Sequence, residues 1–176
     1  MTPADRYGGE GEEMRSEREE LCRVAEACWH GLRTEIEEIE RWRPVYLKPL
    51  WTVRDVMFHC AFRVGAATDA IYAHIENGAC STGTAALGET LDAMNQRVVE
   101  ASQSLTARDV DDHWVVTLNG FLEALWSLDD AAMLRFIACP RGERRPVVEM
   151  VWDELLHVQQ HVDDIFEAVG AEQRAP

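Results

Sequence analysis

Apolar side chains recur every three or four positions through most of this chain, and that spacing constrains the fold more than any other feature. On an α-helix such a spacing places the apolar residues along one face. The pattern is clearest in four long segments, which begin near residues 21, 52, 84 and 148. No run of alternating polar and apolar residues is long enough for a sheet. The sequence therefore predicts an all-α protein.

Capping and turn residues suggest where the first two helices begin and end. The first apolar stripe covers residues 21–39. We expect this helix to end near Pro44, because the residue before a proline avoids helical angles. The second helix begins at Thr52, with Asp55 three residues later in a pattern that resembles a capping box. The Asn-Gly pair at residues 77–78 is a typical stop signal.

The third apolar segment contains a break. Its stripe covers residues 84–105, and Thr106 with Asp109 then repeats the capping pattern before the period resumes over residues 110–128. The resumed part is either a separate helix or the continuation of the third beyond a break. The final stripe covers residues 148–169.

Helices of this kind bury their apolar faces against one another, so the predicted architecture is a four-helix bundle of the up-and-down type. At 176 residues the chain is long enough for one continuous core. Residues 1–14 are rich in glycine and glutamate and lack an apolar period, which predicts a disordered acidic tail. Residues 15–170 are then the single domain.

The formal net charge of −15 excludes several classes of partner. A nucleic-acid-binding protein needs a basic surface to displace counterions, and an anionic membrane would also repel this chain. No stretch approaches the ~20 apolar residues of a membrane helix, and the polar, acidic N-terminus is unlike a secretory signal. The five cysteines form no CxxC pair, which favours reduced thiols in a cytoplasmic protein.

Three histidines are the candidate functional residues. His157 and His161 lie four residues apart in the last helical segment, so both imidazoles project from one face. If the second helix brings His59 to this pair, the result is a three-nitrogen site with open positions, as catalytic metals use. Each of the three falls on the flank of its apolar stripe, at the border of the bundle interior. A histidine pair at this spacing also occurs by chance, so a structural role remains an alternative.

The sequence around these histidines resembles a known superfamily. Residues 51–59, WTVRDVMFH, resemble the W-[ST]-x-x-D-[VL]-x-x-H segment of the DinB/YfiT-like proteins. The later HVQQH of residues 157–161 resembles their second metal motif, and Asn95 stands at a familiar family position. The likeness covers roughly residues 15–170. It implies a four-helix bundle with a divalent metal held by His59, His157 and His161.

The resemblance also implies a class of activity. The superfamily includes enzymes that act with mycothiol or bacillithiol, such as S-transferases and maleylpyruvate isomerases, and proteins that protect bacteria from their own reactive natural products. It implies here a metal-dependent S-transferase or related detoxification enzyme that acts on a small electrophile. Arginine supplies all but one of the 17 basic residues, a bias typical of GC-rich genomes that favours mycothiol as the thiol. The sequence lacks the extra C-terminal domain of the isomerases, which counts against that reaction.

Several points stay open within this reading. Three imidazoles suit zinc, nickel, iron or copper, and zinc is the first choice by abundance. Relatives are often dimeric, so a homodimer is compatible with the sequence. The basic loop that contains Arg141 and Arg144 could steer an anionic thiol cofactor or substrate toward a cleft, or it could simply be solvated. Cys60 could be a nucleophile, but its position on the apolar stripe predicts burial.

Two other functions remain as alternatives. The same ion could activate water for hydrolysis or for the ring opening of a reactive natural product. Glu154, one turn before His157, is then the nearest candidate for a catalytic base, with Asp153 and Asp164 as further candidates, although each could equally be a supporting or solvated carboxylate. The metal could instead stabilise a non-catalytic binding protein. Structural zinc sites, however, usually have a fourth protein ligand.

Overall fold

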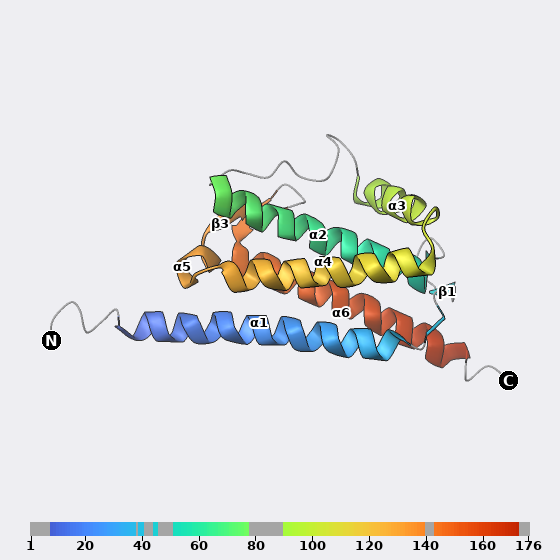
Figure 1. Ribbon diagram of the computed structural model, residues 1–176, viewed down its shortest axis with the longest axis horizontal. Helices are drawn as coiled ribbons and strands as arrows, with labels where there is room; N and C mark the ends of the chain where they lie inside the picture. The colour runs from blue at the N-terminus through green and yellow to red at the C-terminus, as the bar shows by residue number, and fades with distance from the viewer. Residues whose placement is uncertain are drawn as a thin grey trace.

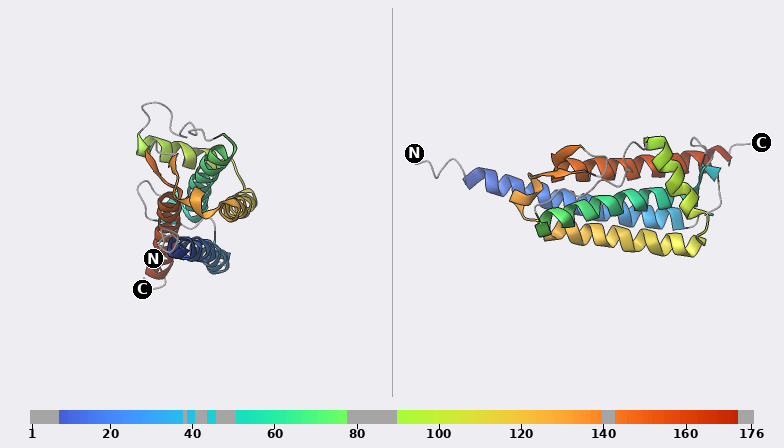
Figure 2. Two further views of the ribbon diagram at one scale, coloured as in Figure 1. Left: turned by 90° about the vertical axis from the view of Figure 1, so that its left-hand side faces the viewer. Right: turned by 90° about the horizontal axis from the view of Figure 1, so that it is seen from above.

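Four long helices lie side by side in the computed structural model, which describes residues 8–37, 39–40, 44–45, 51–77, 90–139 and 143–172 (Figure 1). Seen along its length, the bundle has these helices arranged around a common interior (Figure 2). The long helices are α1 (Gly8–Glu37), α2 (Val53–Asn77), α4 (Ala107–Ser127) and α6 (Val147–Glu172), and the shorter ones are α3 (Leu91–Ser102) and α5 (Asp130–Met133). The predicted all-α four-helix bundle is confirmed.

Two short antiparallel ladders lead into the helices that carry the three histidines. β1 (Pro44–Val45) pairs with β2 (Trp51–Thr52), and β3 (Phe136–Ala138) pairs with β4 (Arg144–Pro146). β2 is followed directly by α2, and β4 directly by α6. Each ladder therefore holds the starting point of one of these two helices.

The helix directions depart from a strict up-and-down order at one connection. The Ser102 hydroxyl, at the end of α3, donates a 2.7 Å hydrogen bond to Asp55 at the start of α2. Arg54 donates to the carbonyl of Leu105, two residues before α4 begins. α2 and α4 therefore begin at the same end and run parallel (Figure 1), because the chain between them, which includes α3, returns to that end. Within the predicted bundle, this pair of helices is therefore parallel rather than antiparallel.

Both predicted helix starts have the expected caps. The backbone N–H of Thr52 donates to Asp55 Oδ2 at 2.9 Å, and Thr106 makes the same 2.9 Å bond to Asp109 in a full capping box. The second box resolves the open question about the third apolar segment, since α3 and α4 are separate helices on either side of it. Such caps satisfy backbone donors that a helix leaves without partners at its first turn.

Asp55 links the start of α2 to α3 as well as to Thr52. Burial acts to raise the pKa of this carboxyl, but the hydrogen bonds from Thr52 and Ser102 and the charge on Arg54 outweigh it, so the pKa is lowered. The ionised form is thus favoured at neutral pH. An ionised Asp55 holds the first turn of α2 in place, one turn before His59.

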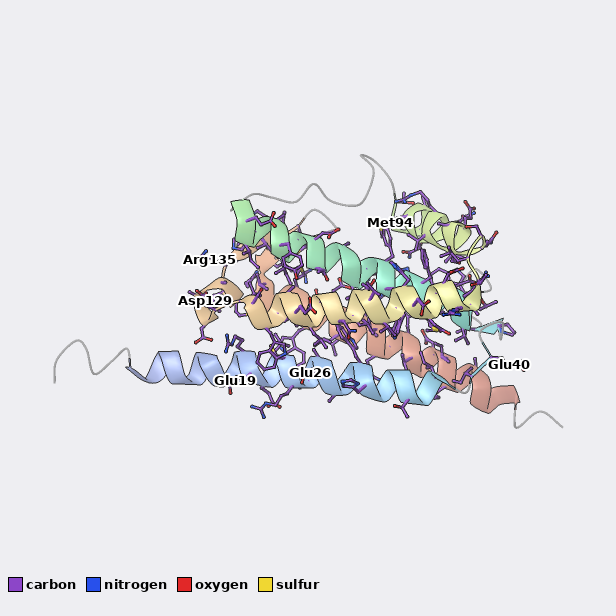
Figure 3. The ribbon with its side chains drawn as sticks, in the orientation of Figure 1. Glu19, Glu26, Glu40, Met94, Asp129 and Arg135 are labelled. Carbon is purple, nitrogen blue, oxygen red and sulfur yellow. The ribbon has the colours of Figure 1, made fainter. Side chains whose placement is uncertain are left out.

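The core consists of the apolar faces predicted from the periodicity. Phe121 and Leu125 of α4 are fully buried and meet Leu21 of α1 and Ile165 of α6 in one continuous cluster. Charged side chains lie on the outside, as Figure 3 shows for Glu19 and Asp129. The charged side chains that are buried among the described residues are those of Arg54, Asp55, Arg63 and Glu154.

The first helix begins earlier than the sequence suggested. α1 starts at Gly8, so residues 8–14 of the predicted disordered tail are helical, whereas residues 1–7 lie outside the described part. A disordered tail over residues 1–7 stays a prediction. Among the described helices, none is both long and apolar enough to cross a membrane.

Candidate metal centre

The three histidines predicted from the sequence come together between α2 and α6. His59 lies on α2, and His157 and His161 lie one turn apart on α6. Their candidate ligand atoms all lie within 4.8 Å of one another, and Nε2 of His59 is 3.0 Å from Nε2 of His157. Residues that are 98 positions apart in the sequence are therefore adjacent in space.

The His59 ring packs edge to face against the other two rings, and the nitrogen atoms of all three converge. The His59 ring lies at 67° to that of His157 and at 87° to that of His161, with centroids 5.2 Å apart in both pairs. Two nitrogen ligands, each ~2.0–2.1 Å from one ion, are roughly 2.9–3.4 Å apart in octahedral or tetrahedral geometry. The 3.0 Å separation fits that range. An N–H···N hydrogen bond between two neutral imidazoles would have the same length.

The local sequence explains how each ring reaches this position. His59 follows the Thr52 cap by about two turns, on the side of α2 that faces α6, and is 2% exposed. His157 and His161 are half-buried. His157 and His161 thus lie at the border of the bundle interior, whereas His59 lies deeper than its flank position predicted. The site is therefore largely sheltered from bulk water.

Trp51 forms one wall of the histidine cluster. Its indole lies 5.1 Å from the His59 ring and 6.3 Å from the His161 ring, measured between centroids, and the residue is 4% exposed. The β1–β2 ladder positions it, with Val45 opposite Trp51. Its Nε1–H has no acceptor among the residues that the structure describes. The wall is therefore apolar except for one hydrogen-bond donor.

Asp164 supports the third histidine from the same helix. Its Oδ2 lies 3.3 Å from Nδ1 of His161. Burial lowers the pKa of His161, and the charge on Arg63 acts in the same direction, while Asp164 acts against them. The neutral imidazole, which is the form that binds metals, is thus favoured. A carboxylate at Nδ1 would leave Nε2 as the ligand atom, in the arrangement common for metal-bound histidines.

A buried ion pair lies one helical turn away from the three histidines. Arg63 donates from Nε and Nη2 to the two oxygens of Glu154, at 3.0 and 2.6 Å, and each side chain is only 7% exposed. Arg63 follows His59 by one turn of α2, and Glu154 precedes His157 by one turn of α6. This bidentate pair therefore links the two histidine-bearing helices beside the site.

Sequence reasoning found Glu154 but missed its partner Arg63. Spacing could have found it, since antiparallel packing of two helices that places His59 opposite His157 also places the next turns opposite each other. Both oxygens of Glu154 accept hydrogen bonds from Arg63, which suits a structural link better than a catalytic base. Asp153, the other upstream candidate, pairs with Arg145. A role as base for either residue stays a prediction.

The remaining candidates do not join the cluster. Arg141 lies outside the described residues. Arg144 is exposed on β4 and donates to the carbonyl of Phe136 across the ladder. α6 begins ten residues before His157, which places that ladder ~15 Å away along the helix axis. Asn95 is half-buried on α3, outside the group.

Cys60 is buried, as its position on the apolar stripe predicted. It is 1% exposed, and burial raises the pKa of its thiol far above the ordinary value. A thiol in that state is a poor nucleophile, since the thiolate is the reactive form. Cys22 and Cys139 are also buried, free thiols.

Among the described residues, the metal-binding group contains no fourth histidine, cysteine or carboxylate. Three neutral nitrogen donors bind zinc and similar borderline ions well. A site with only three protein ligands leaves coordination positions for water or a substrate. The donor set therefore fits a catalytic divalent metal.

Comparison with known proteins gives the fold. No protein-family model matches the chain, and no curated protein matches it by sequence. YfiT from Bacillus subtilis, described as a probable metal-dependent hydrolase with an unusual four-helix bundle topology, matches with a TM-score of 0.71 at 15% identity, over 90% of this chain and 89% of YfiT. Mycothiol-dependent maleylpyruvate isomerase matches with a TM-score of 0.68 at 14% identity, over 84% of this chain. The chain spans 60% of the length of that isomerase. The YfiT-like bundle fold expected from the sequence is thus confirmed.

Proposed function

We propose that this chain is a divalent-metal-dependent enzyme that transfers a low-molecular-weight thiol of the mycothiol type to a small electrophile. His59, His157 and His161 would hold the ion. The observation that carries the proposal is the convergence of three nitrogen ligands, without a fourth in the described group, at the border of the interior. The shared fold with a mycothiol-dependent isomerase and a probable metal-dependent hydrolase supports it.

The residues around the site have distinct roles in this proposal. A divalent ion would act as a Lewis acid and stabilise the thiolate form of a thiol at neutral pH. Trp51 excludes water from one side, and Asp164 orients the His161 ring. The Arg63–Glu154 pair keeps α2 and α6 at the separation that lets His59 meet His157.

The reaction itself needs no further group from the protein. The thiol releases its proton to solvent, and its sulfur supplies the electron pair for a new S–C bond. The leaving group on that carbon departs with its bonding pair. Detoxification fits this chemistry, because the electrophile leaves as a stable thioether.

Thiol chemistry suits the surroundings of the site better than hydrolysis does. A thiol is far more acidic than water, so activation of water depends more on a nearby base. Here the oxygens of Glu154 are engaged by Arg63, and Asp164 contacts His161. Hydrolysis or ring opening remains the second candidate, since YfiT is described as a probable hydrolase. Activity lost in Glu154→Gln while the metal is retained would favour it.

A non-catalytic, metal-stabilised binding protein is the third candidate. Three ligands from two helices would hold α2 against α6. The open coordination positions argue against this role. The enzyme proposal places the protein in the cytoplasm, where small thiols stay reduced. A homodimer stays a prediction.

Thiol transfer can be tested by mass spectrometry. Zinc-loaded protein would be incubated with mycothiol and a panel of small electrophiles, and the thioether product would be quantified. We expect product from the wild type and from His30→Ala, which changes an exposed histidine of α1, but not from His157→Ala/His161→Ala. Equal background rates for all three proteins, with metal bound to the wild type, would reject thiol transfer.

A further inference from the structure

Trp51 carries a buried hydrogen-bond donor that no described residue of the protein accepts. The β1–β2 ladder pairs its backbone with Val45, but the indole Nε1–H has no acceptor among the described residues. An unpaired buried donor is destabilising, so most buried donors are matched by a protein partner, a water or a ligand. The indole of Trp126, by contrast, donates to Glu26 at 3.1 Å.

Position distinguishes Trp51 from the other tryptophans with unpaired indoles. Trp29 and Trp114 line a cavity of about 30 Å³ between α1 and α4, which is large enough for a water molecule to satisfy them. Trp51 instead packs against two of the three histidines in the candidate metal centre. Its ring therefore borders the candidate metal centre.

The charges around the site indicate what kind of ligand would enter. Arg63 and Glu154 cancel each other in their bidentate pair, and Asp164 contributes one negative charge beside His161. Three neutral imidazoles add none, and a divalent ion adds two positive charges. One positive charge remains in a partly buried region, and a single monoanion would cancel it.

We propose that Trp51 donates its indole Nε1–H to a monoanionic ligand, such as a thiolate, that occupies the open position of the metal centre. This inference rests on the proposed function, because it requires the metal. It would make Trp51 a determinant of which ligands the metal centre binds. The donor would favour ligands whose metal-binding atom keeps a free lone pair, and the ring would shield that atom from water.

Cobalt-loaded protein allows the donor to be tested without an activity assay. Azide and 2-mercaptoethanol would be titrated separately, and the visible spectrum of cobalt would report binding. The test variant is Trp51→Phe, which keeps an aromatic ring against the histidines and removes the N–H. The matched control is Trp114→Phe, which removes another buried, unpaired indole N–H, one that lines the cavity between α1 and α4.

We expect Trp51→Phe to bind cobalt like the wild type but to bind either probe roughly tenfold or more weakly, as the loss of a hydrogen bond to a charged acceptor predicts. Trp114→Phe should match the wild type. Unchanged probe affinity in a cobalt-loaded Trp51→Phe would overturn the inference alone. A cobalt-loaded wild type that binds neither azide nor 2-mercaptoethanol would also overturn the inference alone. A wild type that binds no metal would overturn the proposed function as well.

A second measurement needs no variant. In zinc-loaded wild-type protein, the Nε1–H resonance of Trp51 should shift downfield when azide is added, while that of Trp114 should not. A Trp51 resonance that stays in place while azide binds would contradict the inference, even if Trp51→Phe failed to fold.

Discussion

Replacement of Glu154 by alanine should destabilise the protein more than any other single loss of an ion pair described above. The change leaves the Arg63 guanidinium in a position where its side chain is only 7% exposed, without the carboxylate that neutralises it. Two charge-assisted bonds, of 3.0 and 2.6 Å, are lost together. Hydrogen bonds to charged groups contribute about 1.5–3 kcal/mol each, and removal of one partner of a buried pair costs about 3–5 kcal/mol. We therefore expect the free energy of unfolding to fall by about 3–5 kcal/mol.

Urea unfolding of the metal-free protein at pH 7 measures this loss. The matched control is Asp153→Ala, at the adjacent position of α6, whose partner Arg145 and own carboxylate are 39% and 43% exposed. An exposed pair contributes about 0–1 kcal/mol, so the control should unfold close to the wild type. If Glu154→Ala and Asp153→Ala lost the same small amount, the Arg63–Glu154 pair would not be a buried link between α2 and α6.

Three further predictions address the same region. The double variant Arg63→Met/Glu154→Leu should recover most of the stability lost in Glu154→Ala, because it leaves no buried charge unpaired. In a competition titration it should bind zinc about 10–100-fold more weakly than the wild type, because the ion pair no longer sets the separation of α2 and α6. Asp55→Asn should cost about 1–2 kcal/mol at pH 7. Because the pKa of Asp55 is lowered in the folded state, its contribution to stability is present above the unfolded pKa of ~3.9 and is lost as pH falls through the folded pKa. The urea midpoints of variant and wild type should therefore converge as the solution is acidified past the folded pKa. Cys60 should resist a thiol reagent in the native protein and react only after unfolding, because burial raises its pKa.

The sequence was sufficient where local chemistry decides the structure. The apolar period identified the helices because their stability depends on the burial of one face, and the Thr52–Asp55 and Thr106–Asp109 pairs marked helix starts because capping needs only neighbouring residues. The three histidines could also be proposed, since two share a helix face and the third lies in the recognised W-T-x-x-D-V-x-x-H segment.

Features that depend on long-range packing were out of reach. The parallel arrangement of α2 and α4 depends on the path of the chain between them, and no local signal specifies it. Arg63 and Glu154 are 91 residues apart, so their pairing becomes visible only when α2 is placed against α6. The loop residue Arg144 looked available for ligand binding, but pairing of β3 with β4 directs it to the carbonyl of Phe136.

Metal content tests the central claim most directly. Untagged wild-type protein and His157→Ala/His161→Ala would be analysed by inductively coupled plasma mass spectrometry, after purification and again after incubation with zinc, nickel and iron(II) followed by desalting. We predict near one equivalent of a divalent metal in the wild type and a loss of that metal in the double variant. A wild type that retains no metal after every incubation would contradict the account, and the three histidines would then be structural residues of a helical bundle.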